Sequence, residues 1–342
     1  MGILDWLRGS GASAASPQER QQIDETVERV VQTTDPKLRF ASRYRARLDP
    51  AVAKSLAYMR ELVATQPAIR EASAAAWSND PYLRAFFASA DELVLAFSRS
   101  PDLRAFFEQN PGVSEAFAVL GMEMTERKIL GMAAEGDKTR SEVAQTAVSF
   151  GDHRVRICGR TESELKAEIE RRLVDQLVLE ALARIAADES RRTALEHDRA
   201  LVKVRLQLLE RQGTGMRGAV GGEAVEQGEL ARLQSQIEEN TRNLGDLGNP
   251  AELLDRELEH VCTVLGEPAS HLVVSSKRLR LDSMNVVIEN GSSQAGTEYE
   301  FLQLRVPGST PPQLRAFALV RIARVELLSA GRLLDEAQQG LA

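Results

Sequence analysis

The chain has 342 residues, of which 43% are hydrophobic and 27% charged, and its formal net charge is -7 at pH 7. This is the composition of a soluble globular protein, and it excludes a chain that is disordered throughout. The acidic balance argues against a general affinity for nucleic acid, although a local basic patch is compatible with it.

The two cysteines, Cys158 and Cys262, lie far apart and form neither a disulfide framework nor a CxxC metal motif, which favours a reducing compartment. No run of the sequence approaches the ~18 apolar residues of a membrane span. The apolar run at residues 3–7 is also shorter than the core of a signal peptide. We therefore expect a cytoplasmic protein, with the inner face of the membrane as a candidate location.

Residues 1–16 are predicted to be an amphipathic segment followed by a flexible Gly/Ser/Ala linker. An apolar segment with a Trp on a tether suits a membrane surface or a groove on a partner. The candidate contact residues are Ile3, Leu4, Trp6 and Leu7. The alternative is a chain terminus that docks on its own core.

Residues 17–134 are predicted to form an all-helical domain of short helices. Pro directly after Asp, Ser or Asn is typical of a helix start, because the preceding side chain caps amide groups and Pro has no amide hydrogen to leave unpaired. The expected breaks are at Asp35-Pro36, Asp49-Pro50, Gln66-Pro67, Asp80-Pro81, Ser100-Pro101 and Asn110-Pro111.

A short repeat lies inside this region, where Pro81-Tyr-Leu-Arg-Ala-Phe-Phe87 returns as Pro101-Asp-Leu-Arg-Ala-Phe-Phe107. The Leu and the Phe pair share a helical face, so that each copy can bury an aromatic cluster. We expect both Phe pairs to belong to a hydrophobic core of this region, with one member of each pair only partly buried because adjacent helical positions diverge by ~100°.

The sequence period changes to two over residues 142–160, which predicts a β-hairpin with a turn at Gly151-Asp152. A second β-rich region is expected within residues 271–342, with strands at 272–275, 278–282, 285–288 and 299–306. An amphipathic helix is expected after it, at about residues 312–339.

Residues 161–265 are predicted to form a long antiparallel helical hairpin with a Gly-rich tip at 213–222. Residues 161–212 contain neither Pro nor Gly, and at ~1.5 Å per residue such a helix is about 78 Å long and needs a partner along its side. The returning segment has a heptad seam with one polar member. Its residues are Leu230, Leu233, Ile237, Asn240, Leu244 and Leu247.

The predicted fold is mostly α with a smaller α+β part. It consists of an N-terminal helical domain, a mixed β head and a long antiparallel coiled-coil stalk. Because an antiparallel hairpin returns to its starting point, the β segments on its two sides are expected to form one sheet.

The sequence contains only weak matches to motifs for catalysis, cofactor binding or metal binding. Gly213-x-Gly215-x-x-Gly218 follows a helix, whereas a dinucleotide site needs a preceding strand. Glu257-x-x-His260 has the spacing of a di-iron ligand pair, but no second such pair occurs. Cys262 and His271 do not complete a zinc site. We therefore predict no cofactor, no metal and no catalytic residues.

A basic face is the remaining candidate site. If the β segments that carry them are neighbours, six basic side chains would form one patch able to contact phosphate, acidic protein or lipid headgroups. These residues are Arg154, Arg156, Arg160, Lys277, Arg278 and Arg280. The alternative is a solvated face that nearby carboxylates balance.

The function that these observations favour is non-catalytic. We expect a bacterial-type scaffold or adaptor that self-associates or binds a protein partner through its helical hairpin, with residues 3–7 as a candidate weak contact to a membrane surface. The alternatives are a nucleic-acid-associated structural protein that uses the basic face, and an enzyme whose site has no recognisable motif.

Overall fold

The computed structural model describes most of the chain, and its described residues form a mixed α+β structure. They divide into unit 1, within residues 1–55 and 177–268, and unit 2, within residues 56–176 and 269–342. The described residues are 16–135, 138–213, 223–247, 252–289, 294–306, 313–329 and 331–333.

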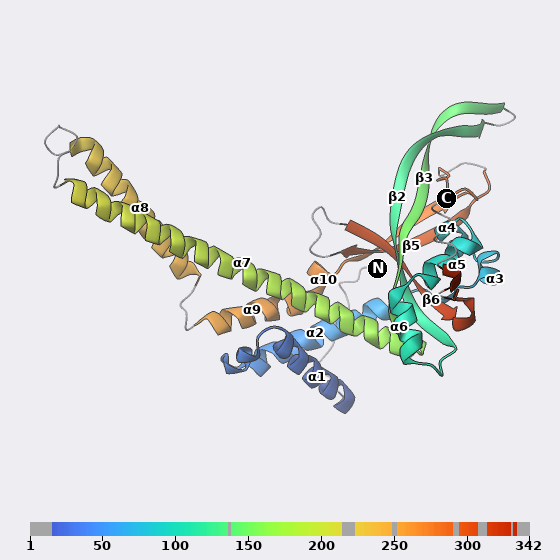
Figure 1. Ribbon diagram of the computed structural model, residues 1–342, viewed down its shortest axis with the longest axis horizontal. Coiled ribbons are helices and arrows are strands. Elements are labelled where there is room, and N and C mark those ends of the chain that lie inside the picture. The colour runs from blue at the N-terminus through green and yellow to red at the C-terminus, as the bar shows by residue number, and fades with distance from the viewer. Residues whose placement is uncertain are drawn as a thin grey trace, which may run out of the picture. The chain divides into compact units, whose positions relative to one another are not determined.

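Unit 2 contains one sheet with the strand order β3-β2-β6-β5-β4, in which neighbouring strands are antiparallel (Figure 1). The short strand β1 (Arg70–Glu71) adds to β6 in parallel. The strands of the main order are β2 (Glu115–Glu135), β3 (Lys138–Gly159), β4 (Val274–Leu281), β5 (Thr297–Val306) and β6 (Gln313–Ala323). The prediction that both β regions belong to one sheet is therefore confirmed.

The two edge strands of this sheet, β3 and β4, are linked by a short segment around Val286. The Val148 N–H donates to the carbonyl of Asn285, and the Val287 N–H donates to the carbonyl of Thr146, both at 2.8 Å. On its other side, the Ile288 N–H donates to the carbonyl of Arg280 at 2.8 Å. The segment thus pairs with both edges, and the sheet curls toward itself.

Four short helices cover one face of the sheet, and each begins at a side-chain cap. Asp80 accepts hydrogen bonds from the amides of the first turn of α4, and Ser100 accepts one from Leu103 in α6. Prolines 81 and 101 therefore start helices as predicted. The four helices are α3 (Ala74–Trp77), α4 (Pro81–Phe86), α5 (Ala90–Ser98) and α6 (Pro101–Gln109).

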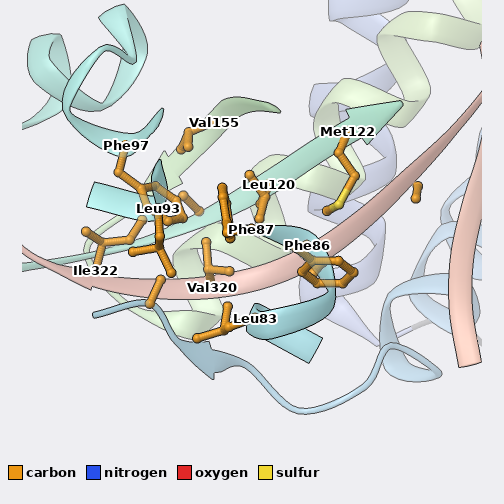
Figure 2. Close-up of a cluster of buried hydrophobic side chains, with 14 of the residues drawn as sticks. Leu83, Phe86, Phe87, Leu93, Phe97, Leu120, Met122, Val155, Val320 and Ile322 are labelled. Carbon is orange, nitrogen blue, oxygen red and sulfur yellow. The ribbon is translucent and has the colours of Figure 1, made fainter. Parts of the chain in front are cut away.

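The core between these helices and the sheet is aromatic on the helix side and aliphatic on β2 and β6 (Figure 2). Phe86, Phe87 and Phe107 are buried, and Phe106 is partly buried at the edge of the cluster. The prediction that both Phe pairs belong to the core is confirmed. The expectation that one member of each pair is only partly buried holds for Phe106 and Phe107 and is wrong for Phe86 and Phe87, both of which are buried. The helices do not enclose a separate core, because the Phe side chains pack against strands.

Unit 1 is helical, and its core joins the N-terminal helices to α9. The hydroxyl of Ser55 donates to the carbonyl of Leu265 at 2.6 Å, and Arg47 forms an ion pair with Asp255 at 3.1 Å. The helices α2, α7 and α10 each contribute residues to both units. The elements are α1 (Pro17–Thr33), the 3-10 helix η2 (Pro36–Phe40), α2 (Tyr44–Ala64), α7 (Glu162–Gly213), α8 (Glu223–Asp246), α9 (Leu253–Gly266) and α10 (Pro268–His271).

Two segments that were predicted to be helical are strands. The all-helical domain expected over 17–134 is wrong from Glu115, where β2 begins, and the helix expected over 312–339 is replaced by β6 and the short 3-10 helix η4 (Arg324–Glu326). Residues 312, 330 and 334–339 of that expected helix lie outside the described residues. Both strands carry apolar side chains on both faces, and periodicity alone does not distinguish such a run from a buried helix.

The hairpin expected within residues 142–160 is also wrong, because β3 is one strand that pairs with β2 over its length. Gly151 pairs with Glu123 and Arg154 with Gly121, so that Asp152, with a φ of 46°, and His153 lie together opposite the single residue Met122. They form a β-bulge, not a turn. The two strands expected at 272–275 and 278–282 are one continuous strand, β4. The helix break expected at Asp49-Pro50 is wrong, because Pro50 lies inside α2.

Replacing Phe87 by Ala should lower the free energy of unfolding of unit 2 by roughly 3–5 kcal/mol, because the ring is fully enclosed. Met284→Ala is the matched control, since Met284 is 80% exposed and should change stability little. Urea denaturation followed by near-ultraviolet circular dichroism measures both. Equal effects of the two substitutions would contradict the assignment of Phe87 to the core.

Stability should also depend on pH through His153, whose ring stacks on Phe87 and whose Nε2–H donates to the carbonyl of Phe86 at 2.8 Å. Burial lowers the pKa of His153 below 6.5. The unfolded chain therefore binds this proton at higher pH than the folded one, and stability should fall as the pH decreases through about 6.5.

The matched variant for this test is His153→Gln, which retains a hydrogen-bond donor without a titrating ring. Urea midpoints between about pH 7.5 and about pH 6 should decline more in the wild type than in this variant. Parallel declines would show that His153 does not contribute to the pH dependence.

Candidate functional site

The part of α7 in unit 1 has a regular stripe of buried and half-buried positions, which we call the first seam. Its members alternate in spacing between three and four residues, the pattern of a helix that packs against other helices along its length. The first seam consists of Ala181, Ile185, Asp188, Arg192, Leu195, Arg199, Val202, Leu206 and Leu209.

The helix α8 returns antiparallel along the far part of the first seam (Figure 1). Arg205 of α7 pairs with Glu229 of α8 at 2.6 Å, and farther down Arg192 donates to the carbonyl of Leu247 at 2.6 Å. All six residues of the predicted heptad from Leu230 to Leu247, Asn240 included, are buried or half-buried. Residues 214–222 of the predicted tip lie outside the described residues.

The near part of the first seam faces α9 through polar groups. Asp188 accepts hydrogen bonds from Arg256 Nε and His260 Nε2, both at 2.9 Å. Burial acts to raise the pKa of Asp188, but the hydrogen bonds from His260 and Arg256 together outweigh it and the pKa is lowered. His260 is thereby engaged by a carboxylate, and no group of His, Cys, Asp and Glu suited to a metal ion occurs among the described residues.

A second stripe on α7 is open to solvent, and we call it the second seam. It consists of Ala194, His197, Leu201, Val204 and Leu208. Leu201 and Val204 are each 55% exposed and Leu208 is 52% exposed. These positions also alternate between three and four residues, so that α7 presents two adjacent heptad faces, of which α8 covers one.

Sequence reasoning missed the second seam, although a signal for it is present. Leu201 directly precedes Val202, and Leu208 directly precedes Leu209, so that apolar residues occur as adjacent pairs at heptad distance. A single seam requires only one member of each pair. The other member therefore belongs to a second face about 100° around the helix.

The six predicted basic residues lie on or next to two strands that are not neighbours, because β3 and β4 are at opposite ends of the strand order. β3 and β4 do not pair directly, but the segment around Val286 pairs with both, so a single basic patch stays a prediction. On the β3 side, the side chains pair with carboxylates, namely Arg154 with Asp152, Arg156 with Asp102 and Arg160 with Glu164. On β4, Lys277 pairs with Glu126, Arg278 pairs with Glu300, and Arg280 donates to the carbonyl of Gln294.

The predicted N-terminal contact residues, Ile3, Leu4, Trp6 and Leu7, lie outside the described residues. In the part of the chain that the structure describes, no helix combines the length and apolar character that crossing a membrane requires.

The cysteine thiols are poor candidates for nucleophilic chemistry. Burial raises the pKa of Cys158 to about 12 and that of Cys262 to about 11. Both thiols are therefore protonated at neutral pH, whereas the thiolate is the reactive form.

Comparison of the chain with protein-family models, with curated proteins and with solved structures found no match.

The pairing of α7 with α8 can be tested by crosslinking. Val202→Cys and Leu233→Cys, introduced together in a Cys158→Ser and Cys262→Ser background, should form an intramolecular disulfide on mild oxidation, because both positions lie in the shared seam. Non-reducing electrophoresis and peptide mass spectrometry detect it.

Leu201→Cys with Leu233→Cys is the matched control for this pair. Because Leu201 lies on the other face of α7, this variant should give no disulfide within the chain. Crosslinks of the 202/233 pair that form only between chains would show that α7 packs against another copy and not against its own α8.

Proposed function

We propose that this protein is a non-catalytic scaffold that self-associates through an antiparallel coiled-coil stalk formed by α7 and α8. The observation that supports this proposal is the second seam. Leu201, Val204 and Leu208 are more than half exposed, although their spacing is that of an apolar face suited to another helix.

The intramolecular packing of the hairpin supports a role for α7 in association. Its first seam is covered within the chain, so α8 does not compete for the second seam. Three large apolar side chains in a heptad stripe become buried when another helix packs on them. A scaffold needs such a surface, whereas catalysis needs a cluster of reactive groups.

A second copy of the chain is the occupant that the charges favour. Asp198 and Arg205 follow His197 and Val204 on the same side of the stripe. If two copies pack antiparallel about a two-fold axis near Leu201, Asp198 of each copy lies opposite Arg205 of the other. This arrangement is complementary in charge, and Arg205, which pairs with Glu229 of its own α8 at 2.6 Å, would lie between two carboxylates.

The predicted contact of Ile3, Leu4, Trp6 and Leu7 with a membrane surface extends this proposal. One short apolar segment binds weakly, but a dimer presents two, and the second contact then forms at a high effective concentration. Self-association would therefore strengthen binding at the inner face of the membrane.

The test is the oligomeric state of Leu201→Glu/Leu208→Glu compared with the wild type. Light scattering coupled to size-exclusion chromatography should give the mass of two chains for the wild type and of one chain for the variant, because two buried carboxylates would face each other across the interface. Helix content, measured by circular dichroism, should not change.

Leu179→Glu is the matched control, since Leu179 is also 55% exposed on α7 but lies outside the second seam. It should remain dimeric. A wild type that is monomeric at all concentrations, or a double variant that dimerises as the wild type does, would refute self-association through this surface.

A further inference from the structure

A cavity of about 430 Å³ lies in unit 2 against the sheet, where residues of β2 and β6 that alternate with core residues line it. Its other walls are the C-terminal end of α2 and the N-terminal turns of α7. The apolar lining residues are Leu62, Val63, Val119, Ile157, Ile169, Leu173, Leu272, Val274, Leu304, Ala316, Phe317 and Leu319.

This volume and lining are typical of a site for a small apolar ligand, which is usually mostly hydrophobic with a few polar groups that fix orientation. The polar side chains of the lining are all Arg or Gln: Gln66, Arg154, Arg156, Arg172, Gln176 and Arg315. No carboxylate is among the described lining residues. The ligand that this chemistry favours is apolar over most of its length and negatively charged at one end.

At one place on the cavity lining, two Arg side chains pair with a single carboxylate. Arg154 Nε and Arg315 Nη1 bind the two carboxylate oxygens of Asp152, at 2.9 Å and 2.7 Å. Two guanidinium groups thus share one carboxylate. The described hydrogen bonds of Arg154 use only its Nε–H, and its half-exposed side chain has further N–H groups to donate to an anion.

Two further features of the lining are unusual for simple packing. The Oε1 atom of Gln66 is buried without a hydrogen-bond partner among the described residues. Ile157 is the extra residue of a β-bulge opposite Ala118 and Val119 and has a φ of 55°, a conformation that a β-branched side chain rarely adopts. The bulge contributes this side chain to the cavity wall.

We infer that the cavity binds a fatty acid. The hydrocarbon chain packs against the apolar wall formed by β2, β6 and the start of α7. The carboxylate accepts hydrogen bonds from Arg154 and Arg315, which share the carboxylate of Asp152 in their described ion pairs. This binding activity is separate from self-association through the second seam, which lies on residues 194–208 of α7.

Gly121 provides a sharp test because it lines the cavity without a side chain. A Cβ built at Gly121 meets only the Arg154 carbonyl oxygen, at 3.8 Å, so that Gly121→Val is sterically tolerated at the backbone while its methyl groups enter the cavity. Gly151→Val on β3 is the matched control, since a Cβ there has no atom within 4 Å and Gly151 is not a lining residue.

The measurement is isothermal titration calorimetry of the delipidated full chain with laurate below its micelle concentration, and competition by dodecan-1-ol. The wild type and Gly151→Val should bind laurate, and Gly121→Val should lose at least about tenfold in affinity. Arg154→Gln should weaken laurate binding by about tenfold, as expected for one lost charge-assisted hydrogen bond, and leave the competition by dodecan-1-ol unchanged.

The inference is overturned if the wild type does not bind laurate, if Gly121→Val binds it as the wild type does, or if Arg154→Gln has no effect on it. A diazirine-bearing fatty acid gives an independent measurement on the unmodified chain, in case Gly121→Val does not fold. Labelling of peptides that contain Leu173 or Phe317 supports the site, and labelling confined to other peptides refutes it.

One competing occupant is the apolar N-terminal segment of the chain itself. If the full-length Ile3→Ser/Trp6→Ser/Leu7→Ser variant binds laurate and the wild type does not, the cavity belongs to that segment, and the fatty acid inference is overturned. Equal binding by the two proteins supports the fatty acid.

Discussion

The structure of unit 2 depends on strands that are apolar on both faces. In β2, Leu120 and Met122 face the aromatic helices, whereas Val119 lines the cavity on the other side. A sheet of this kind needs cover on both sides, and α2 and α7 supply the second cover. Where β3 leads into α7, a Cβ at Gly159 would lie 2.6 Å from the Leu165 nitrogen, so that only glycine permits the close approach.

The burial of both faces of the sheet explains which parts of the fold could be predicted from the sequence. The long helix, the heptad of α8 and the capped starts at Asp80 and Ser100 depend on neighbours a few residues away, and their patterns are local. The strands β2 and β6 pair across some two hundred residues of sequence, and their two-sided burial removes the alternation by which a strand is recognised.

The two candidate sites, the second seam and the cavity, also differ in whether a local sequence pattern predicts them. Adjacent apolar pairs such as Leu201 and Val202 encode the second seam locally, so that a closer count of heptad positions predicts it. The cavity is assembled from α2, α7 and all the strands except β1, and its pair of Arg side chains depends on Arg154 and Arg315 meeting at Asp152. No local pattern contains that information, because the residues become neighbours only through the pairing of β2 with β3 and β6.

At Ile157, the requirements of folding stability and of ligand binding conflict. A β-branched residue at positive φ costs about 1–3 kcal/mol, and glycine at this bulge would recover much of that energy. Glycine would also remove an apolar side chain from the cavity wall. Selection for stability alone would therefore favour glycine at this position, whereas selection for an apolar binding site retains isoleucine. The residue that homologous chains have here would thus indicate which of the two requirements dominates in each lineage.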